Sequence, residues 1–377
     1  MACCGSMIQY VFIIGATGHV GRELVRQIIG EGDWNRKIHK NPTIIVGVAS
    51  RDQFLFSRQG LPHDSVGEFS RRERTGEKYS SLNDILKKVH EEAADDPGKG
   101  NRLIFIDATA VEMLDFHRRV LRNKRWGVVT ANKIPLAGAD WPTFEELTSQ
   151  VHRYGFRCSV MAGADVVNVL QDFRDVNDPV REIYGCFSGT LGYVCTELEK
   201  GKEFSAIVKD AKVKGYTEPH PRDDLNGVDV ARKLLILSRT AGFRIRMEDV
   251  KVEPFIPRTY LNESDIDKFL EAIGGLDNHF RERVLALAKE GKVLRYVGRL
   301  TVEGGKPLAR VGIEETGKGG TLGMLKGRDN KVAIVTKSYP SERPYRIEVP
   351  GAGLEITAQN IRRELLYLLE NRIVRTI

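Results

Sequence analysis

A glycine-rich turn between an apolar strand and an amphipathic helix limits the possible folds of this chain more than any other sequence feature. Residues 10–14 (YVFII) are apolar and rich in β-branched and aromatic side chains, as expected of a buried parallel strand. Gly15, Gly18 and Gly21 follow, and apolar residues then recur at helical spacing. Glycines here let the backbone approach a pyrophosphate, which the N–H groups and positive end of the helix stabilise. We therefore predict a dinucleotide-binding loop; the alternative is a strand–helix turn that binds nothing.

Strands and helices alternate along the first part of the chain. We expect strands at residues 43–49, 103–107 and 126–130 and helices at residues 81–92 and 114–123. This alternation indicates βαβ units with a parallel sheet, and hence an α/β domain of the Rossmann type. Residues 51–100 are long for one connection, so we predict that they include an irregular surface insertion.

The periodicity changes after residue 160 to that of an α+β domain. We expect strands at residues 180–187, 293–303, 309–313 and 331–337 and helices at residues 193–200, 204–214 and 226–240. Residues 357–370 are again helical in pattern. The predicted division is a dinucleotide-binding domain of residues 1–160 and 345–377, a substrate and catalytic domain of residues 161–300, and a β-rich region of residues 301–344.

The end of the second predicted strand bears on the choice of dinucleotide. Enzymes that use NAD usually carry Asp or Glu here, which binds the ribose 2′-hydroxyl. This chain instead has Arg51, whose forked guanidinium suits a 2′-phosphate. We therefore predict NADP as the cofactor. Asp52 follows immediately and leaves NAD possible, and an ordinary solvated arginine is the alternative for Arg51.

Charge, hydropathy and cysteine spacing exclude several classes of partner. The 58 basic and 51 acidic residues give a net charge of +7, but the basic residues are scattered and do not alternate with aromatics, so we expect no nucleic-acid partner. No apolar run approaches the roughly 18–20 residues of a membrane helix, and no basic segment precedes the first apolar run as in a secretory signal. Five cysteines without zinc-type spacing indicate reduced thiols. We expect a cytoplasmic protein that binds no membrane.

Charged residues are concentrated in residues 215–233 (GYTEPHPRDDLNGVDVARK). Asp229 and Lys233 are four residues apart and share one helix face, which alone is typical of a surface salt bridge. We expect Asn226 and Asp229 to cap this helix in the manner of a capping box. A hydride acceptor with amino and carboxylate groups needs carboxylates for its ammonium, a cation for its carboxylate and an acid near its carbonyl oxygen. The segment contains all three.

The same segment resembles the signature of homoserine dehydrogenases, because residues 218–233 follow the pattern E-P-x-P-R-D-D-L-x-G-x-D-V-A-R-K. Residues 130–133 (TANK), 188–190 (SGT) and 351–358 are similar to further stretches of that family. The resemblance covers nearly the whole chain apart from residues 51–100. It implies reduction of L-aspartate 4-semialdehyde to L-homoserine with NADP, and the reverse reaction, in threonine and methionine biosynthesis.

The resemblance also implies roles for residues that would act on or bind the substrate. Lys233 is implied as the proton donor to the aldehyde oxygen, and Asp229 as the residue that orients it and contacts substrate. Glu218 is implied to bind the substrate, through its amino group, and Asp224 and Thr190 to line the same pocket.

A second set of residues is implied to lie at the cofactor. Lys133 is expected between cofactor and substrate and is the second candidate for acid–base catalysis. Thr109 is expected near the nicotinamide side. The full set of expected cofactor-binding residues is Gly15, Thr17, Gly18, His19, Val20, Gly21, Arg51, Thr109, Lys133 and Gly353.

Three features depart from the family's pattern. The glycine loop has the GxxGxxG spacing seen in aspartate-semialdehyde dehydrogenase. His220 stands where the family commonly has Asp, and we expect it to be structural rather than catalytic. The family often binds a monovalent cation, but Arg157 occupies the place of a glutamate ligand, so we expect no cation, or a weakly bound one at the carbonyls of Val160 and Ala162.

The resemblance finally implies an assembly and leaves two other functions open. The β segments between residues 293 and 340 resemble a dimerisation region, which we place at residues 301–344, so we expect a homodimer. We expect neither a fused aspartate kinase nor a regulatory module. The alternatives are aspartate-semialdehyde dehydrogenase, which needs a thiolate nucleophile, and a non-catalytic NADP-binding sensor on the same fold.

Overall fold

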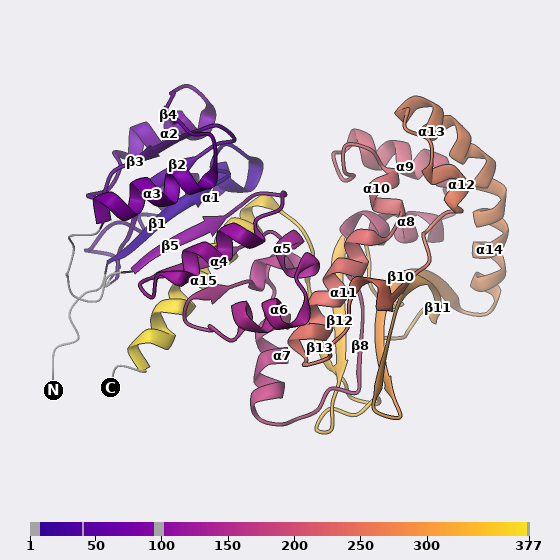
Figure 1. Cartoon of the computed structure of the whole chain (residues 1–377). Coiled ribbons are helices and arrows are strands. Elements are labelled where there is room, and N and C mark those ends of the chain that lie inside the picture. The colour runs from indigo at the N-terminus through magenta and orange to yellow at the C-terminus, as the bar shows by residue number, and fades with distance from the viewer. Residues whose placement is uncertain (1–7, 40, 94–101, 375–377) are drawn as a thin grey trace. The chain divides into compact units, whose positions relative to one another are not determined.

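The chain folds into two compact units (Figure 1). This computed structural model describes residues 8–39, 41–93 and 102–374. One unit comprises Met1–Gly163 and Gly353–Ile377, and the other Ala164–Ala352. The chain therefore leaves the first unit once and returns to it near its C-terminus. Residues 301–344, the expected dimerisation region, belong wholly to the second unit.

Within the described residues, the first unit holds a seven-stranded sheet in the order β4-β3-β2-β1-β5-β6-β7. The strands are β1 (Gln9–Ile14), β2 (Thr43–Ala49), β3 (Gln53–Phe56), β4 (Glu77–Lys78), β5 (Arg102–Asp107), β6 (Trp126–Thr130) and β7 (Tyr154–Gly155). The five strands from β2 to β7 pair in parallel, which confirms the predicted α/β class. The carboxyl ends of β1, β5 and β6 therefore meet at one edge of the sheet.

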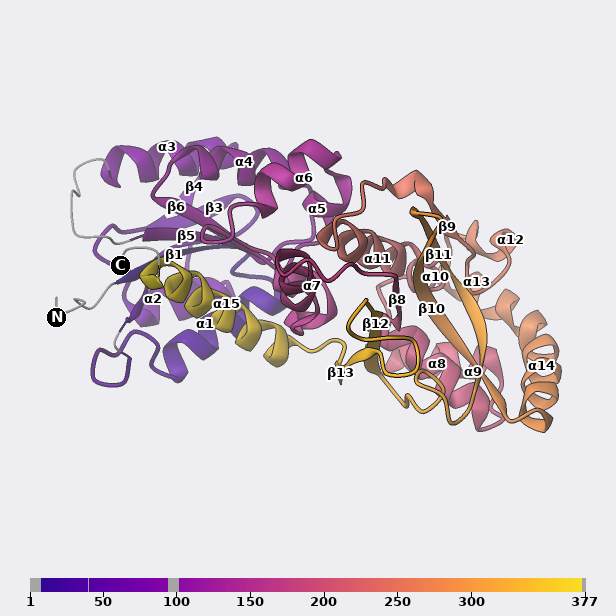
Figure 2. The same cartoon turned by 90° about the horizontal axis from the view of Figure 1, so that it is seen from below.

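Helices cover both faces of this sheet (Figure 2). They are α1 (His19–Gly30), α2 (His63–Arg71), α3 (Leu82–Ala93), α4 (Leu114–Arg122), α5 (Ile134–Gly138), α6 (Trp141–Thr148) and α15 (Leu354–Val374). Helices α1 and α15 share one face, where Leu24 and Ile28 of α1 and Ile361 of α15 form a core with Val11 and Ile13 of β1. Burial of this apolar surface accounts for the return of the C-terminal helix to the first unit.

Residues 53–93 are more regular than predicted. The short strand β3 pairs antiparallel with β2, and β4 pairs antiparallel with β3. Phe54 and Phe69 are buried, so α2 and β3 belong to the unit's core rather than to an irregular insertion. Strands of two and four residues are too short to show a period in sequence, which is why β3 and β4 were not predicted. Residues 72–75 form an exposed irregular turn, as predicted. The segment 94–101 lies outside the described residues.

The second unit is an α+β domain, as predicted. Its described residues form a six-stranded sheet in the order β13-β12-β8-β10-β11-β9, antiparallel except for the β9–β11 pair. The strands are β8 (Glu182–Cys186), β9 (Val250–Val252), β10 (Lys292–Glu303), β11 (Lys306–Gly317), β12 (Asp329–Val335) and β13 (Tyr345–Pro350). The helices are α7 (Val166–Asp175), α8 (Gly189–Glu199), α9 (Phe204–Val213), α10 (Arg222–Leu225), α11 (Val228–Thr240), α12 (Arg258–Leu261), α13 (Ile266–Ala272) and α14 (Asp277–Lys289).

Helices α8 and α11 pack against the central strand β10. Gly298 of β10 provides the close approach, because a Cβ there would lie 2.9 Å from the ring of Phe187 and 3.4 Å from Val230. The sheet thus supports the start of α8 and the first turns of α11. None of the helices in the described residues has the length and apolar character needed to cross a membrane.

Candidate active site

The glycine loop between β1 and α1 has a backbone that only small residues permit. Gly15 has a φ of +85°, and a Cβ there would lie 3.0 Å from the carbonyl oxygen of Ala108. A Cβ on Gly21 would lie 2.2 Å from the carbonyl oxygen of Gly15, so α1 crosses the loop in close contact. The backbone N–H of Gly15 donates to the Ala49 carbonyl at 3.0 Å, which ties the loop to the end of β2. The loop therefore fits a dinucleotide pyrophosphate at the start of α1.

The remaining loop residues lead into the helix. Thr17 is half-buried, Gly18 and His19 are exposed, and Val20 packs on the core below. Gly18 is the N-cap of α1 and, as a glycine, has no side chain that could accept a hydrogen bond from the first turn. The first-turn N–H groups of a helix have no partner within the helix, so such an end is suited to an anion.

Arg51 lies in a tight turn between β2 and the antiparallel strand β3. The Ser50 N–H donates to the Gln53 carbonyl at 2.8 Å, and the Tyr79 hydroxyl donates to the Ser50 carbonyl at 2.7 Å. The side chains of Arg51 and Asp52 are exposed at the tip. Arg51 therefore has the position at the end of β2 that the sequence suggested, although the hairpin that presents it was not foreseen.

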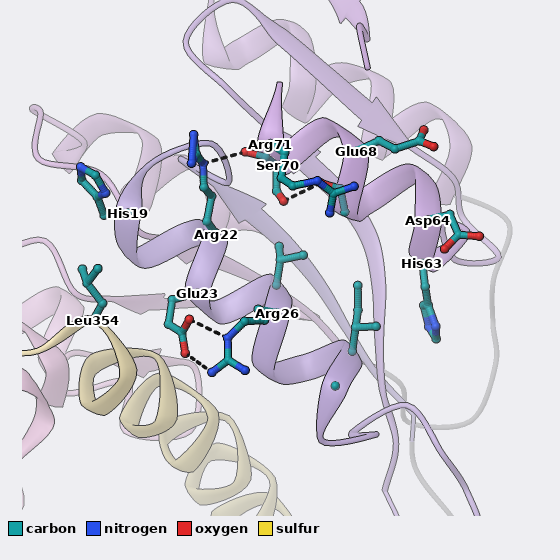
Figure 3. A pocket seen from close by; sticks show the side chains of 14 residues that line it. His19, Arg22, Glu23, Arg26, His63, Asp64, Glu68, Ser70, Arg71 and Leu354 are labelled. Carbon is teal, nitrogen blue, oxygen red and sulfur yellow. Dashed lines mark hydrogen bonds and ion pairs between the residues drawn. The ribbon is translucent and has the colours of Figure 1, made fainter. Parts of the chain in front are cut away.

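A pocket of about 720 Å³, with several charged side chains in its wall, lies between α1 and α2 (Figure 3). Its wall includes the Glu23–Arg26 ion pair and Arg22, whose Nε donates to the Ser70 carbonyl at 3.0 Å. His19 lines the pocket at the end nearest the glycine loop, but Arg51 does not line it. The pocket therefore lies beside the predicted cofactor loop and does not contain most of the predicted cofactor residues.

Gly353 lies where the chain re-enters the first unit. Its carbonyl accepts hydrogen bonds from the Thr357 N–H at 3.0 Å and the Thr357 hydroxyl at 2.8 Å, in the first turn of α15. The Gln27 side chain of α1 donates to the Glu355 carbonyl at 2.9 Å. These contacts fix the start of α15 next to α1.

A buried hydrogen-bond network orders the loop after β5. Asp107 is the last residue of β5 and is 1% exposed, and its Oδ1 accepts from the Thr109 N–H at 2.9 Å and the Thr109 hydroxyl at 2.7 Å. Its Oδ2 lies 3.1 Å from Nε2 of the buried His117. Burial alone raises the pKa of Asp107, but the hydrogen bonds and charge of His117 and the Thr109 contacts bring it below its ordinary value. The carboxylate is therefore ionised and holds Thr109 in place.

The network continues to the loop after β6. The Asn132 side chain donates to the Thr109 hydroxyl at 3.2 Å and to the Val111 carbonyl at 2.7 Å. Lys133 follows directly and precedes α5 as its N-cap. Thr109 and Lys133 were predicted from the sequence, whereas Asp107 and His117, which order this network, were missed. The sequence signal for Asp107 was its position as a charged residue at the end of an otherwise apolar strand.

Arg157 is buried and pairs with the C-terminal helix. Its Nε lies 2.9 Å from Oε2 of Glu364, and its guanidinium lies 4.9 Å from the centre of the Tyr367 ring. The Ala162 carbonyl, an expected cation ligand, accepts from the Asn360 amide at 2.8 Å. A guanidinium thus occupies the place of an anionic ligand, and a carbonyl ligand is already engaged. These residues do not fit a bound monovalent cation.

The predicted substrate residues come together in the second unit around the start of α8. The hydroxyl of Thr190, in the first turn of α8, donates a hydrogen bond to the Tyr216 carbonyl at 2.6 Å. The Glu218 N–H donates to Oδ2 of Asp224 at 2.7 Å. Glu218 is exposed, whereas Asp224 is largely buried. Residues from α8, α10 and the loop between α9 and α10 therefore form one acidic cluster.

The surroundings of Asp224 raise its pKa to about 6. Burial is the largest cause and the charges of Glu218 and Asp229 add to it, while hydrogen bonding by the Glu218 N–H and the Thr190 hydroxyl opposes the rise. A carboxyl group that is costly to ionise alone favours a cationic partner. The cluster can thus bind an ammonium group.

Lys233 is held from two sides. Its Nζ lies 2.8 Å from Oδ2 of Asp229 on the same helix and donates to the Phe187 carbonyl at 2.7 Å. The Lys233 side chain is 13% exposed and that of Asp229 35% exposed, so the pair is not an ordinary surface salt bridge. Phe187 directly precedes the Ser188 N-cap of α8, which brings the lysine to the turn that carries Thr190.

The predicted capping box is wrong. Helix α11 begins after Gly227, which has a left-handed φ of +76° and provides no side-chain cap. The Asn226 side chain accepts from the Val228 N–H at 2.8 Å, so Asn226 closes the turn before the helix. Asp229 pairs with Lys233 instead of capping the helix.

His220 has a structural position. It is buried, its Nδ1 accepts from the Arg222 N–H at 3.2 Å, and its ring lies 5.0 Å from that of Phe269. Burial lowers the pKa of His220, so the ring is neutral at pH 7. The Arg222 side chain donates to the Glu263 carbonyl at 2.6 Å. His220 and Arg222 together attach the segment that carries Glu218 and Asp224 to the chain around α12 and α13.

Cys158, Cys186 and Cys195 are buried free thiols, as predicted. Burial raises the pKa of Cys158 well above its ordinary value and raises the pKa of Cys186 and Cys195 to about 12. Thiols with such raised pKa values are poor sources of a thiolate nucleophile near neutral pH. Cys3 and Cys4 lie outside the described residues.

Comparison with known proteins gives a consistent family. Residues 166–366 match the family model described as homoserine dehydrogenase. The chain is 32% identical over 281 residues to a homoserine dehydrogenase of Paracoccidioides brasiliensis, covering 71% of this chain and 75% of the relative. It is 30% identical over 367 residues to a bifunctional aspartokinase/homoserine dehydrogenase of Haemophilus influenzae, covering 96% of this chain and 43% of the relative. The chain thus spans less than half the length of this bifunctional relative.

Solved structures show the same fold. A Candida auris protein of unknown function superimposes with a TM-score of 0.82 at 29% identity, covering 97% of this chain and 99% of that one. A hyperthermophilic archaeal homoserine dehydrogenase in complex with NADPH has a TM-score of 0.70 at 18% identity, covering 97% and 98% of the two chains.

Proposed function

The chain belongs to the homoserine dehydrogenase family, and from this premise we propose that it interconverts L-aspartate 4-semialdehyde and L-homoserine with NADP. This reaction is a step of threonine and methionine biosynthesis. The observation that carries the proposal is the side-by-side arrangement of the Lys233–Asp229 pair and the acidic cluster of Thr190, Glu218 and Asp224. An enzyme that reduces an amino-acid aldehyde needs an acid at the carbonyl and carboxylates at the ammonium.

Each member of this group has one proposed task. Glu218 and Asp224 bind the substrate ammonium, with Thr190 beside them. Lys233 donates a proton to the aldehyde oxygen as negative charge develops there, and Asp229 together with the Phe187 carbonyl holds its Nζ in place. Lys133 of the first unit remains the second candidate for acid–base catalysis.

The proposed cofactor is NADP, which when bound supplies the hydride from C4 of its nicotinamide. The Gly15–Gly21 loop would hold the pyrophosphate, and Thr109, ordered by Asp107, would lie on the nicotinamide side. Arg51 would pair with the 2′-phosphate from its exposed turn. The archaeal relative solved with NADPH supports this class of cofactor.

The test is homoserine oxidation by the purified chain, followed at the nicotinamide absorbance with NADP and with NAD. We expect turnover with both L-homoserine and NADP present, and a higher kcat/KM for NADP than for NAD. An Arg51→Asp variant should shift this preference toward NAD. Unchanged preference would remove Arg51 from the phosphate site, and absence of turnover with either dinucleotide would contradict the proposed reaction.

Two alternatives make different predictions. Aspartate-semialdehyde dehydrogenase would require a reactive thiolate, and the raised thiol pKa values of Cys158, Cys186 and Cys195 disfavour it. A non-catalytic sensor would bind NADPH without oxidising homoserine, so the same assay combined with an NADPH titration separates it. We further propose that the chain acts as a homodimer in the cytoplasm, with residues 301–344 at the dimer interface.

A further inference from the structure

Arg328, between β11 and β12, is a cation beside the acidic cluster. Its guanidinium carbon lies 4.0 Å from the centre of the Tyr216 ring. A Cβ on Gly189 would lie 3.8 Å from Arg328 Nε, so the arginine also lies against the first residue of α8. Arg328 is exposed and, in the part of the chain that the structure describes, neither hydrogen-bonds nor pairs with a carboxylate.

Both contacts of Arg328 belong to the framework of the acidic cluster. Tyr216 accepts the Thr190 hydroxyl proton through its carbonyl and lies two residues before Glu218. Gly189 directly precedes Thr190 in the first turn of α8. The arginine side chain therefore lies against Gly189, the sequence neighbour of Thr190. Its guanidinium stacks on Tyr216, two residues before Glu218.

Charge balance at this place calls for a cation that the substrate residues do not supply. Glu218, Asp224 and Asp229 are carboxylates, and Lys233 is already paired with Asp229. These three acidic groups outnumber the single Lys233 ammonium. The excess of negative charge attracts the ammonium group of an amino-acid substrate but repels its carboxylate.

Three cations of the α9–α10 region have partners of their own. Lys214 pairs with Asp210 at 2.7 Å, Lys212 donates to the Pro219 carbonyl at 3.1 Å, and Arg222 donates to the Glu263 carbonyl at 2.6 Å. Arg328 differs from these three in that its donors are not engaged. Stacking on Tyr216 orients the plane of its guanidinium and leaves the N–H edges available for a carboxylate.

We infer that Arg328 binds the α-carboxylate of the amino-acid substrate and so determines specificity for an amino acid over a simple amino alcohol or amino aldehyde. This inference rests on the proposed function and names the group that completes the same site. Arg328 would form a bidentate pair with the carboxylate while the acidic cluster binds the ammonium.

The test compares two ligands that differ only in the carboxylate. L-Homoserine and 3-aminopropan-1-ol, which has hydrogen in place of that group, are titrated calorimetrically into the protein saturated with NADPH, so that no oxidation occurs. The proteins are the wild type, Arg328→Gln, Arg328→Lys and the matched control Lys326→Gln, which changes an exposed cation of the same loop. Thermal unfolding of each variant and the KM for NADP report on any general disturbance.

We expect the wild type to bind homoserine more tightly than the amino alcohol. Arg328→Gln should weaken homoserine binding by about tenfold or more, as for loss of a charged hydrogen-bonded pair, and leave the amino alcohol unchanged. Arg328→Lys should recover part of the difference, and Lys326→Gln should behave like the wild type.

Other results overturn the inference. Equal weakening of both ligands would show a structural effect of Arg328, and unchanged homoserine binding would remove it from the site. If the wild type oxidises homoserine and Arg328→Gln binds it normally, the inference alone fails. If the wild type neither binds nor oxidises homoserine, the proposed function fails with it.

Discussion

Lys233 obtains its position from contacts that a surface lysine would lack. Its ammonium is shared between the Asp229 carboxylate and the Phe187 carbonyl, in a side chain that is 13% exposed. Asp107 has the corresponding role in the first unit, where its carboxylate holds Thr109 by two hydrogen bonds. In both units a charged residue with a fixed hydrogen-bond geometry therefore belongs to the proposed site.

Replacement of Lys233 should separate catalysis from binding. Lys233→Ala removes the proposed proton donor, and we expect turnover of homoserine to fall by about a hundredfold or more, as for loss of a general acid. Affinity for NADPH should be retained, because Lys233 belongs to the second unit. Lys200→Ala is the control, since Lys200 is 59% exposed and pairs with Glu197. Equal turnover in Lys233→Ala and Lys200→Ala would refute the assignment.

Asp224 should give the protein a characteristic pH dependence. Its pKa is raised to about 6 in the folded state, whereas an unfolded Asp titrates near 3.9. The folded state therefore binds more protons between these values, and this carboxyl's contribution to stability is lost as pH rises toward 6 and above. Substrate ammonium prefers the ionised carboxylate, so the KM for homoserine should fall as pH rises through about 6.

The Asp224→Asn variant tests both effects. The melting temperature of the variant minus that of the wild type should increase from pH 4 to pH 7. The wild type must ionise a buried carboxyl over this range, whereas the variant has no such group. Its KM for homoserine should be high and should no longer fall across pH 6. A melting difference that is constant with pH would show that the Asp224 pKa is not raised.

The elements that carry the site depend on glycines at their ends. Helix α11, which bears Asp229 and Lys233, starts after Gly227 with a φ of +76°. A Cβ there would lie 1.9 Å from the hydroxyl of Tyr296, which donates to the Glu253 carbonyl at 2.7 Å. The start of α11 is thus fixed by contact with β10, which local sequence could not reveal and which explains why the capping box failed.

Gly227→Ala should lower the free energy of unfolding more than Gly201→Ala does. Gly201 follows α8 with a φ of +78°, and a Cβ there would have no atom within 4 Å, so its substitution costs only the backbone strain of about 1–2 kcal/mol. Gly227→Ala adds a steric clash with Tyr296 and should lower the free energy of unfolding further, with a loss of turnover as Lys233 moves. Urea unfolding measures both variants. Equal free-energy losses would show that the Tyr296 contact relaxes without cost.

The second unit presents a sheet face that suits the proposed dimer. Along β10, Arg299 points away from the side on which Gly298 meets Phe187 and Val230. Arg299 pairs there with Glu182 and Glu314. In register, Leu308 of β11 lies opposite Thr301 on that same face and is 52% exposed. Leu308 is therefore a position at which the proposed dimer interface can be tested.

Sedimentation velocity tests the assembly at the scale of the whole molecule. We expect the wild type to sediment as a dimer and Leu308→Asp to shift it toward monomer, because a carboxylate would be buried unpaired at the interface. Leu285→Asp is the matched control, since Leu285 is 59% exposed on α14. A monomeric wild type, or equal dissociation of both variants, would contradict the proposed dimer.

Local sequence determined much of this protein. The apolar strands with period two, the helices with period 3.6 and the glycine turn between β1 and α1 predicted the parallel sheet and the α+β unit, because these patterns arise between neighbouring residues. The long motif at residues 218–233 indicated the family and placed Asp229 and Lys233 on one helix face.

Only the tertiary structure decided the contacts between distant parts of the chain. Arg157 pairs with Glu364 in place of a cation site, Asp107 engages His117, and Arg328 stacks on Tyr216. Burial and charge shift the pKa of Asp224 in the same way, through groups on α8, on α11 and in the loop between α9 and α10. The sequence lists the chemical groups, but their distances and their exclusion from water arise only when the segments pack together.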